Sequence, residues 1–187
     1  MFDTVLIAGL GLMGGSMAKT IKARTLSRVL GWNRTRATAE QALADGSIDA
    51  ISTEALSKEA DLVIIGLYPQ ATVDWLLENM SKMKKGCVIV DMVGVKQFMV
   101  DHLEQAALDA GVHYVGGHPM AGREFSGLDF ALSTLFDGAS MIFVPTKSST
   151  ERVLEQLEAY FMSLGFGQTV RCTAQQHDHM IAFTSQL

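Results

Sequence analysis

A glycine-rich turn near the N-terminus has the residues and spacing to bind a phosphate-containing ligand. The turn follows a continuous apolar run at residues 4–8 and opens a segment of helical composition. In that context its backbone N–H groups and the N-terminus of the helix could hold a pyrophosphate. The turn matches the pattern G-x-G-x-x-G and predicts a dinucleotide site at Gly9, Leu10, Gly11, Leu12, Met13 and Gly14.

The residues that should meet the adenosine ribose favour NADP over NAD. They come about 20 positions after the glycines, at the end of a second strand, where an acidic side chain would bind the ribose hydroxyls of NAD. This chain instead has Asn33, Arg34 and Thr35, which offer neutral donors and a cation suited to a 2′-phosphate. A turn with a solvated arginine is the alternative, and it would leave NAD possible. The cofactor site is also expected to include Leu67, Tyr68 and Pro69.

A histidine between glycines is the candidate general base. His118 lies in the segment from Gly116 to Gly122, just beyond a predicted strand, at the edge where α/β sheets bind ligands. With an ordinary pKa of about 6.5, a neutral imidazole can accept a proton near neutral pH. A lone histidine is more often structural, and that alternative stays open on these residues alone.

Composition and charge exclude several classes of protein. The 187 residues are 48% hydrophobic and 19% charged, with a net charge of -5 and no lysine-arginine cluster, which argues against nucleic acid. No apolar stretch is long enough to span a membrane, and no export signal is present, so we expect a cytoplasmic protein. Cys87 and Cys172 lack metal-type spacing, which indicates reduced thiols and no metal site.

The segments that must position these residues alternate between strand and helix patterns. Strands are predicted at 4–8, 28–32, 61–67, 87–92, 112–115, 141–144 and 168–171. Helices are predicted at 13–25, 36–45, 71–83 and 97–110. Two more are predicted to begin at capping boxes, one at Ser148 and Glu151 and the other at Thr173 and Gln176. This alternation predicts an α/β fold of the doubly wound Rossmann type with a mostly parallel sheet. We expect a nucleotide-binding domain over 1–172 and the start of a connecting helix over 173–187.

Three motifs together resemble the prephenate/arogenate dehydrogenase family. They are residues 9–16, residues 117–127, and His177-Asp178 followed by Ala182 and Ser185. The resemblance covers essentially the whole chain. It implies oxidative decarboxylation of prephenate or arogenate, with hydride transfer to NADP or NAD and with His118 accepting the hydroxyl proton. It also implies that the substrate site includes Arg123, Glu124, Ser126 and His177, that Lys96 lies on the nicotinamide side, and that the full-length form is a homodimer.

The chain departs from the family pattern in two places. The family usually has Asp-x-x-Ser-Val-Lys, where the serine hydroxyl contacts the substrate hydroxyl and the histidine, whereas this chain has Gly94. A water molecule or Ser126 would then have to orient His118. Family members also continue into a helical domain, whereas this sequence reads Ser185-Gln186-Leu187 and stops. We therefore expect cofactor binding without efficient turnover by these 187 residues.

Two other functions remain open at this point. A β-hydroxyacid dehydrogenase or imine reductase also begins with a similar glycine turn and often follows its second strand with Asn-Arg-Thr. Its catalytic lysine segment is not evident here, and the motif around His118 has no known role there. From a different class, the chain could be a non-catalytic dinucleotide-binding module.

Overall fold

The computed structural model describes residues 2–184 and contains one eight-stranded sheet. Its strand order is β3-β2-β1-β4-β5-β6-β7-β8. The pairing of β6 with β7 is antiparallel and every other pairing is parallel. The strands are β1 (Thr4–Ala8), β2 (Arg28–Trp32), β3 (Ala50–Ile51), β4 (Leu62–Ile65), β5 (Val88–Asp91), β6 (His113–Pro119), β7 (Ser140–Pro145) and β8 (Gln168–Arg171).

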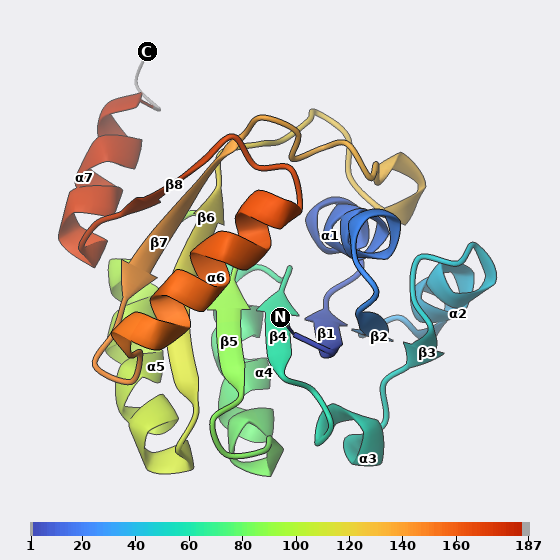
Figure 1. The fold of residues 1–187 in the computed structure, drawn as a ribbon, viewed down its shortest axis with the longest axis horizontal. Helices are drawn as coiled ribbons and strands as arrows, with labels where there is room; N and C mark the ends of the chain where they lie inside the picture. The colour runs from blue at the N-terminus through green and yellow to red at the C-terminus, as the bar shows by residue number, and fades with distance from the viewer. Residues whose placement is uncertain (1, 185–187) are drawn as a thin grey trace.

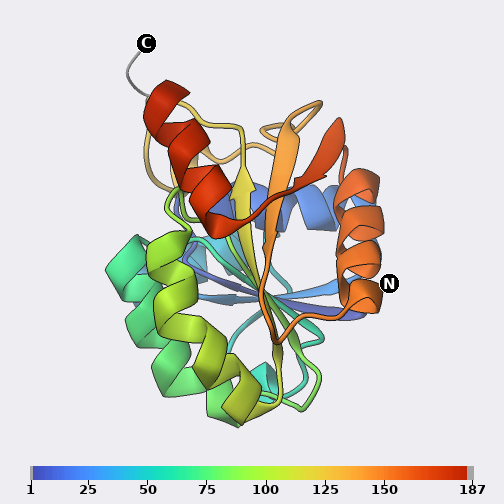
Figure 2. The same ribbon diagram turned by 90° about the vertical axis from the view of Figure 1, so that its left-hand side faces the viewer.

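Helices cover both faces of this sheet (Figures 1 and 2). One face carries α1 (Leu12–Arg24), α2 (Arg36–Ala44) and α6 (Glu151–Ser163), and the other carries α4 (Pro69–Asn79) and α5 (Gln97–Ala110). The remaining helices are α3 (Glu54–Ser57), α7 (Ala174–Thr184) and the 3-10 turns η1 (Met80–Lys82) and η2 (Leu128–Phe130). The expected doubly wound Rossmann-type architecture is confirmed.

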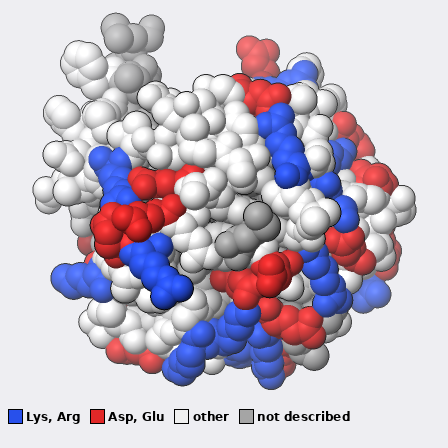
Figure 3. All heavy atoms as spheres, viewed as in Figure 1, with Lys and Arg blue, Asp and Glu red and all other residues white. Residues whose placement is uncertain are grey.

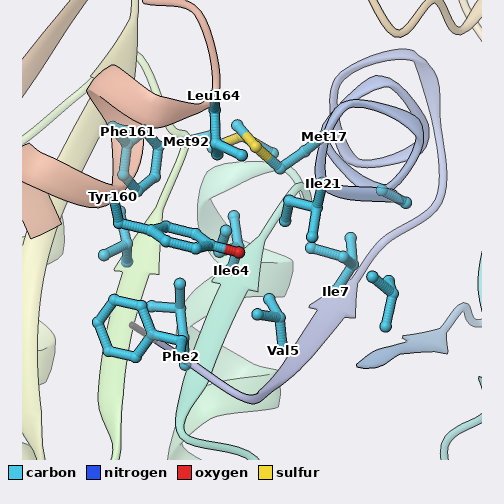
Figure 4. Close-up of a cluster of buried hydrophobic side chains, with 14 of the residues drawn as sticks. Phe2, Val5, Ile7, Met17, Ile21, Ile64, Met92, Tyr160, Phe161 and Leu164 are labelled. Carbon is cyan, nitrogen blue, oxygen red and sulfur yellow. The ribbon is translucent and has the colours of Figure 1, made fainter. Parts of the chain in front are cut away.

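The hydrophobic core explains why the central strands are apolar throughout. Every residue of β4 is buried, because helices cover it on both sides. On the face shown in Figure 4, Phe2 packs edge-on against Tyr160 with ring centroids 5.1 Å apart, and Phe161 packs edge-on against Phe143 at 5.3 Å. These contacts fix α6 against the sheet. A separate buried cluster fills the opposite face, between the sheet and helices α4 and α5.

Most predicted elements form, and β1, β2, β8 and α5 have the predicted bounds. The pattern missed β3 and α3, which have two and four residues and are too short to show periodicity. The capping residue of α6 was also predicted wrongly. Thr150, not Ser148, accepts the backbone N–H of Val153, and the Ser148 hydroxyl instead lies buried against Tyr114.

Helix α7 begins at the capping box that the sequence predicted. The backbone N–H of Thr173 donates to Gln176 Oε1 at 2.9 Å, and the N–H of Gln176 donates to Thr173 Oγ1 at 3.2 Å. Helix α7 lies beyond the N-terminal end of α5, on the same side of the sheet (Figure 2). The expectation for Ser185, Gln186 and Leu187 lies outside the described residues.

Within residues 2–184, no helix has both the length and the apolar character needed to cross a bilayer. Basic and acidic side chains both occur across the face in Figure 3.

Candidate functional site

The glycine turn joins β1 to α1 in a backbone geometry that side chains would not permit. Gly9 has φ of +94°, a conformation that favours glycine. A Cβ on Gly14 would lie 1.7 Å from the carbonyl oxygen of Gly9, whereas a Cβ on Gly11 would meet no atom within 4 Å. Gly9 and Gly14 are therefore required by the turn itself. Gly11 leaves open space at the N-terminus of the helix.

This helix N-terminus fits an anionic ligand. Gly11 is the N-cap of α1, no side chain caps it, and its first turn has no acidic residue. The partial positive charge of the helix dipole is thus available to a phosphate group. Asn33 braces the turn, because its Oδ1 accepts the backbone N–H of Leu10 at 3.0 Å while its Nδ2 donates to the carbonyl of Thr35 at 3.1 Å.

Two cavities flank the glycine turn and form one groove. The larger, of about 430 Å³, is lined mainly by apolar surface from β2 and α4, including Trp32 and Trp75. The smaller, of about 250 Å³, extends past Met92 to Ser126. The two cavities share Gly11, Gly66, Leu67 and Tyr68. An elongated groove across a phosphate-binding turn has the shape that a dinucleotide requires.

The predicted cofactor residues fall into two groups in this structure. Those that line the groove are Gly9, Gly11, Leu12, Met13, Asn33, Arg34, Thr35, Leu67 and Tyr68. Leu10 is instead buried, Gly14 supports the turn, and Pro69 occupies the first turn of α4. Arg34 is exposed and is the only cation among the described lining residues of the larger cavity, where Asp74 and Glu78 also lie.

His118 lies on β6, opposite Ile142 of β7, rather than beyond the end of the strand as predicted. Gly117 allows β6 to approach β5, because a Cβ there would lie 2.3 Å from the carbonyl oxygen of Asp91. A Cβ on Gly94 would lie 3.6 Å from both Cε1 and Nε2 of His118. A serine at position 94 would therefore stand beside Nε2, and the glycine leaves this side of the imidazole without a hydroxyl.

His177 orients the His118 ring from the other side. The Nδ1 atom of His118 is 2.8 Å from Nε2 of His177, and Nδ1 of His177 is 2.7 Å from Oδ1 of Asp178. Among the described residues, no hydrogen bond joins Ser126 to His118, and Ser126 lines the smaller cavity. Burial, and after it the nearby charge of Lys96, lowers the pKa of His118 from 6.5 to about 4. The imidazole is thus neutral at physiological pH and can accept a proton.

The structure places Lys96 differently from the expectation that it faces the nicotinamide. Its side chain is fully buried, lines neither cavity, and pairs with the carboxylate of Asp91. The hydroxyl of Tyr114 donates to the other oxygen of Asp91 at 2.7 Å. A buried ammonium needs a partner, and Asp91 satisfies this requirement beneath His118.

The loop after β6 contributes one of its three predicted residues to the groove. Ser126 lines the smaller cavity. Arg123 and Glu124 are exposed, and the Arg123 guanidinium stacks over Phe125 at 5.4 Å from the ring centroid. His177, also predicted to bind substrate, is fully buried with both ring nitrogens engaged. Its contact in this structure is His118.

Sequence reasoning missed Asp91 and Tyr114, and it named Asp178 only as part of a family motif. Asp178 in fact accepts the N–H groups of Lys96 and Gln97, at 2.8 and 2.9 Å, at the start of α5. The adjacency of His177 and Asp178 was a usable signal, because a carboxylate often orients a histidine. No sequence spacing links Asp178 to α5. Among residues 2–184, no group of histidine, cysteine or acidic side chains could hold a metal ion.

Comparisons with known proteins agree with this geometry. The family model described as prephenate dehydrogenase, nucleotide-binding domain, matches residues 17–168. The chain is 34% identical to a prephenate dehydrogenase of Bacillus subtilis over 99% of its own length and 50% of that protein.

Two solved structures resemble the fold closely. An arogenate dehydrogenase of Synechocystis superposes with a TM-score of 0.88 at 26% identity, covering 97% of this chain and 64% of that one. A prephenate dehydrogenase of Aquifex aeolicus, in complex with hydroxyphenyl propionate and NAD+, superposes with a TM-score of 0.86 at 25% identity, covering 100% and 68%. The chain spans about half the length of the curated prephenate dehydrogenases that it matches.

Proposed function

The chain belongs to the prephenate dehydrogenase family, and from this premise we propose that it forms the cofactor-binding part of a dehydrogenase that oxidatively decarboxylates prephenate or arogenate. The observation that carries the proposal is the groove across the glycine turn, in a chain whose strand β6 also carries a neutral His118. The family match favours this function over a β-hydroxyacid dehydrogenase, an imine reductase or a non-catalytic module. The proposed function assigns a role to each residue of the site.

The turn would bind the pyrophosphate through the N-terminus of α1, and the larger cavity would hold the adenosine against Trp32 and Trp75. When bound, the nicotinamide accepts a hydride from the ring carbon that bears the substrate hydroxyl. His118 takes the proton of that hydroxyl on Nε2, and carbon dioxide leaves as the ring becomes aromatic. Ser126 lines the smaller cavity, in which the nicotinamide would lie, and Arg123 and Glu124 would line the substrate side.

We propose NADP as the preferred cofactor, on the basis of Arg34. Its guanidinium is exposed at the larger cavity next to Thr35, where a 2′-phosphate could form charge-assisted hydrogen bonds. Asp74 and Glu78 lie in the same lining and would oppose that phosphate if they were close to it. The relative affinity for the two cofactors therefore depends on Arg34.

We further propose that the full-length protein is a cytoplasmic homodimer in which residues 173–187 connect to further helices. Two observations support this. Cys87 and Cys172 are free thiols, as is usual in a reducing compartment. Helix α7 exposes Phe183 to 68% and Met180 to 43%, and exposed apolar side chains at one site are typical of an interface.

The experiment has a binding arm and a turnover arm. Calorimetric titration should give a lower dissociation constant for NADPH than for NADH, and Arg34→Ala should reduce that preference about tenfold, the loss of roughly 1.4 kcal/mol. Arg36→Ala is the matched control, because Arg36 pairs with Glu40 and does not line the cavity. A clear preference of the unmodified chain for NADH would refute the NADP proposal.

For turnover, formation of reduced cofactor is followed with prephenate and with arogenate, using both cofactors. We expect slow turnover, since Gly94 provides no hydroxyl, and we expect His118→Asn to remove most of the rate with little change in cofactor affinity. Cofactor binding combined with an unaltered rate in His118→Asn would show that His118 is not the base.

A further inference from the structure

A hydrogen-bonded series of three side chains ends at the ring of His118. The Oδ1 atom of Asp178 is 2.7 Å from Nδ1 of His177, and Nε2 of His177 is 2.8 Å from Nδ1 of His118. His177 is fully buried, and its ring lies at 59° to that of His118 with centroids 5.0 Å apart. The two rings therefore meet through their nitrogen atoms and do not stack.

The carboxylate at the start of this series is ionised and held in place. Although burial alone would raise the pKa of Asp178, hydrogen bonds from the Gln97 N–H, from His177 and from the Lys96 N–H together hold it below its usual value. Both backbone donors belong to the start of α5, at 2.9 and 2.8 Å. An ionised carboxylate can only accept hydrogen bonds.

That restriction determines where each proton lies along the series. Because Asp178 only accepts, Nδ1 of His177 must carry the proton between them. A neutral imidazole has one N–H group, so Nε2 of His177 is an acceptor, and Nδ1 of His118 must donate to it. Nε2 of His118 is then unprotonated, on the side of the ring that faces Gly94.

We propose that His177 and Asp178 are positioning residues, which fix His118 in the Nδ1-protonated tautomer so that Nε2 is free to accept the substrate hydroxyl proton. The proposal deepens the proposed function and rests on it for the identity of that hydroxyl. When Nε2 takes the proton, His118 becomes an imidazolium whose Nδ1–H still points to His177, with the charge of Asp178 behind it. His177 thereby provides from Nδ1 the ring orientation that a serine at position 94 would provide from the side of Nε2.

Other charged groups also face His118 and must be kept constant in a test. Asp91, the last residue of β5, and Lys96, at the start of α5, form a buried ion pair near it. Lys96 disfavours the imidazolium, whereas Asp91 and Asp178 favour it. A variant that removes Asp178 and leaves Lys96 and Asp91 in place separates the series from this ion pair.

The primary test is long-range proton–nitrogen NMR of the ¹⁵N-labelled chain at pH 7, which reports the protonation of each ring nitrogen without requiring turnover. We expect His118 to be protonated at Nδ1 and not at Nε2. Asp178→Asn should weaken this preference, because a neutral amide can also present its NH2 group to Nδ1 of His177, whose Nε2–H would then donate to His118. Asp101→Asn, which removes an exposed carboxylate of α5 bonded only to Gln97, should leave the His118 tautomer unchanged.

The unmodified chain can overturn the proposal by itself. A His118 ring protonated at Nε2, or a cationic His177 that donates from both nitrogens, would contradict it. Should Asp178→Asn unfold, His177→Phe provides the second variant, because a phenyl ring offers no nitrogen that could accept from Nδ1 of His118. His118 should then lose its preference for the Nδ1 proton, and an unchanged tautomer would count against the assignment.

A kinetic measurement separates this proposal from the proposed function. If the chain turns over, Asp178→Asn should lower kcat about 100-fold, the usual contribution of a general base, with KM and the cofactor dissociation constant within about twofold. A purely structural role would instead change cofactor binding and thermal stability together. Absence of turnover with the expected tautomer would leave the positioning role of Asp178 supported, because the tautomer is measured without turnover.

Discussion

At the scale of single residues, the environment of His118 decides its protonation. Burial is the largest cause of its lowered pKa of about 4, and the charge of Lys96 adds to it. A buried imidazole that stays neutral can act as a base from the first encounter with substrate, without first losing a proton. The lowered pKa of His118 also makes the free energy of unfolding of the domain depend on pH.

We predict that the free energy of unfolding falls as the pH drops from 6.5 to about 4. In this window the unfolded chain binds a proton at His118 with a pKa of about 6.5, whereas the folded chain does not. The unfolded state thus binds more protons, so stability rises with pH and is fully present above pH 6.5. Urea unfolding at pH 7.5 and pH 5.0 measures the difference, which His118→Asn should reduce.

The matched control for this measurement is His179→Asn, because His179 is exposed on α7. It should retain the pH dependence of the unmodified chain. Equal pH dependence in the His118 and His179 variants would contradict a depressed pKa at His118. Carboxylates with lowered pKa values, such as that of Asp178, act at lower pH and do not produce a loss above pH 5.

At the scale of elements, the glycines of the β1–α1 turn have two different roles. Gly9 and Gly14 are needed by the fold, whereas Gly11 leaves space for a ligand. Gly11 has φ of -76° and ψ of -155°, which alanine can adopt, and a Cβ there would meet no protein atom within 4 Å. A Cβ on Gly14 would overlap the Gly9 carbonyl oxygen at 1.7 Å. Backbone cannot move away as the end of a flexible side chain can, so the two positions should respond differently to substitution.

We predict that Gly11→Ala keeps the thermal midpoint of the unmodified chain but weakens NADPH binding at least about tenfold, or 1.4 kcal/mol. Its methyl group would occupy the space that the pyrophosphate needs. Gly14→Ala should lower the thermal midpoint by several degrees, since it displaces α1 from β1. Thermal unfolding and calorimetric titration of both variants test the pair. Normal cofactor affinity in Gly11→Ala would show that this turn does not hold the pyrophosphate.

At the scale of the whole molecule, the two buried clusters on either side of the sheet make the groove rigid. Phe161 is fully buried and contacts Phe143 and Phe166, with ring centroids 5.3 and 5.4 Å away. It anchors α6 to the last strands, from which the chain continues into α7 and His177. The position of His177 beside His118 therefore depends on packing more than 10 residues away in the sequence.

We predict that Phe161→Ala lowers the free energy of unfolding by about 3–5 kcal/mol, the usual result of emptying a phenylalanine site in a core. Met162→Ala is the matched control, because Met162 is the next residue on α6 and is 44% exposed. It should change stability by less than about 0.5 kcal/mol. Denaturant unfolding of both variants measures this, and equal losses would contradict the assignment of Phe161 to the core.

The sequence by itself determined the architecture and the cofactor turn. Buried parallel strands must be apolar throughout, and a tight turn into a helix needs glycine at fixed spacing, so both leave local patterns. The bounds of α5 and the capping box of α7 were predictable for the same reason, since each depends on residues within one or two turns.

Only the tertiary structure decided which side chains surround His118. Asp91 and Lys96 pair in the core, Gly94 stands beside Nε2, and Asp178 reaches from α7 to cap α5. The family resemblance implied that Lys96 lies on the nicotinamide side, and the structure buries it instead. The bond between His118 and His177 joins residues 59 positions apart. Local propensity does not encode such a contact, which exists only once the sheet and its covering helices have packed.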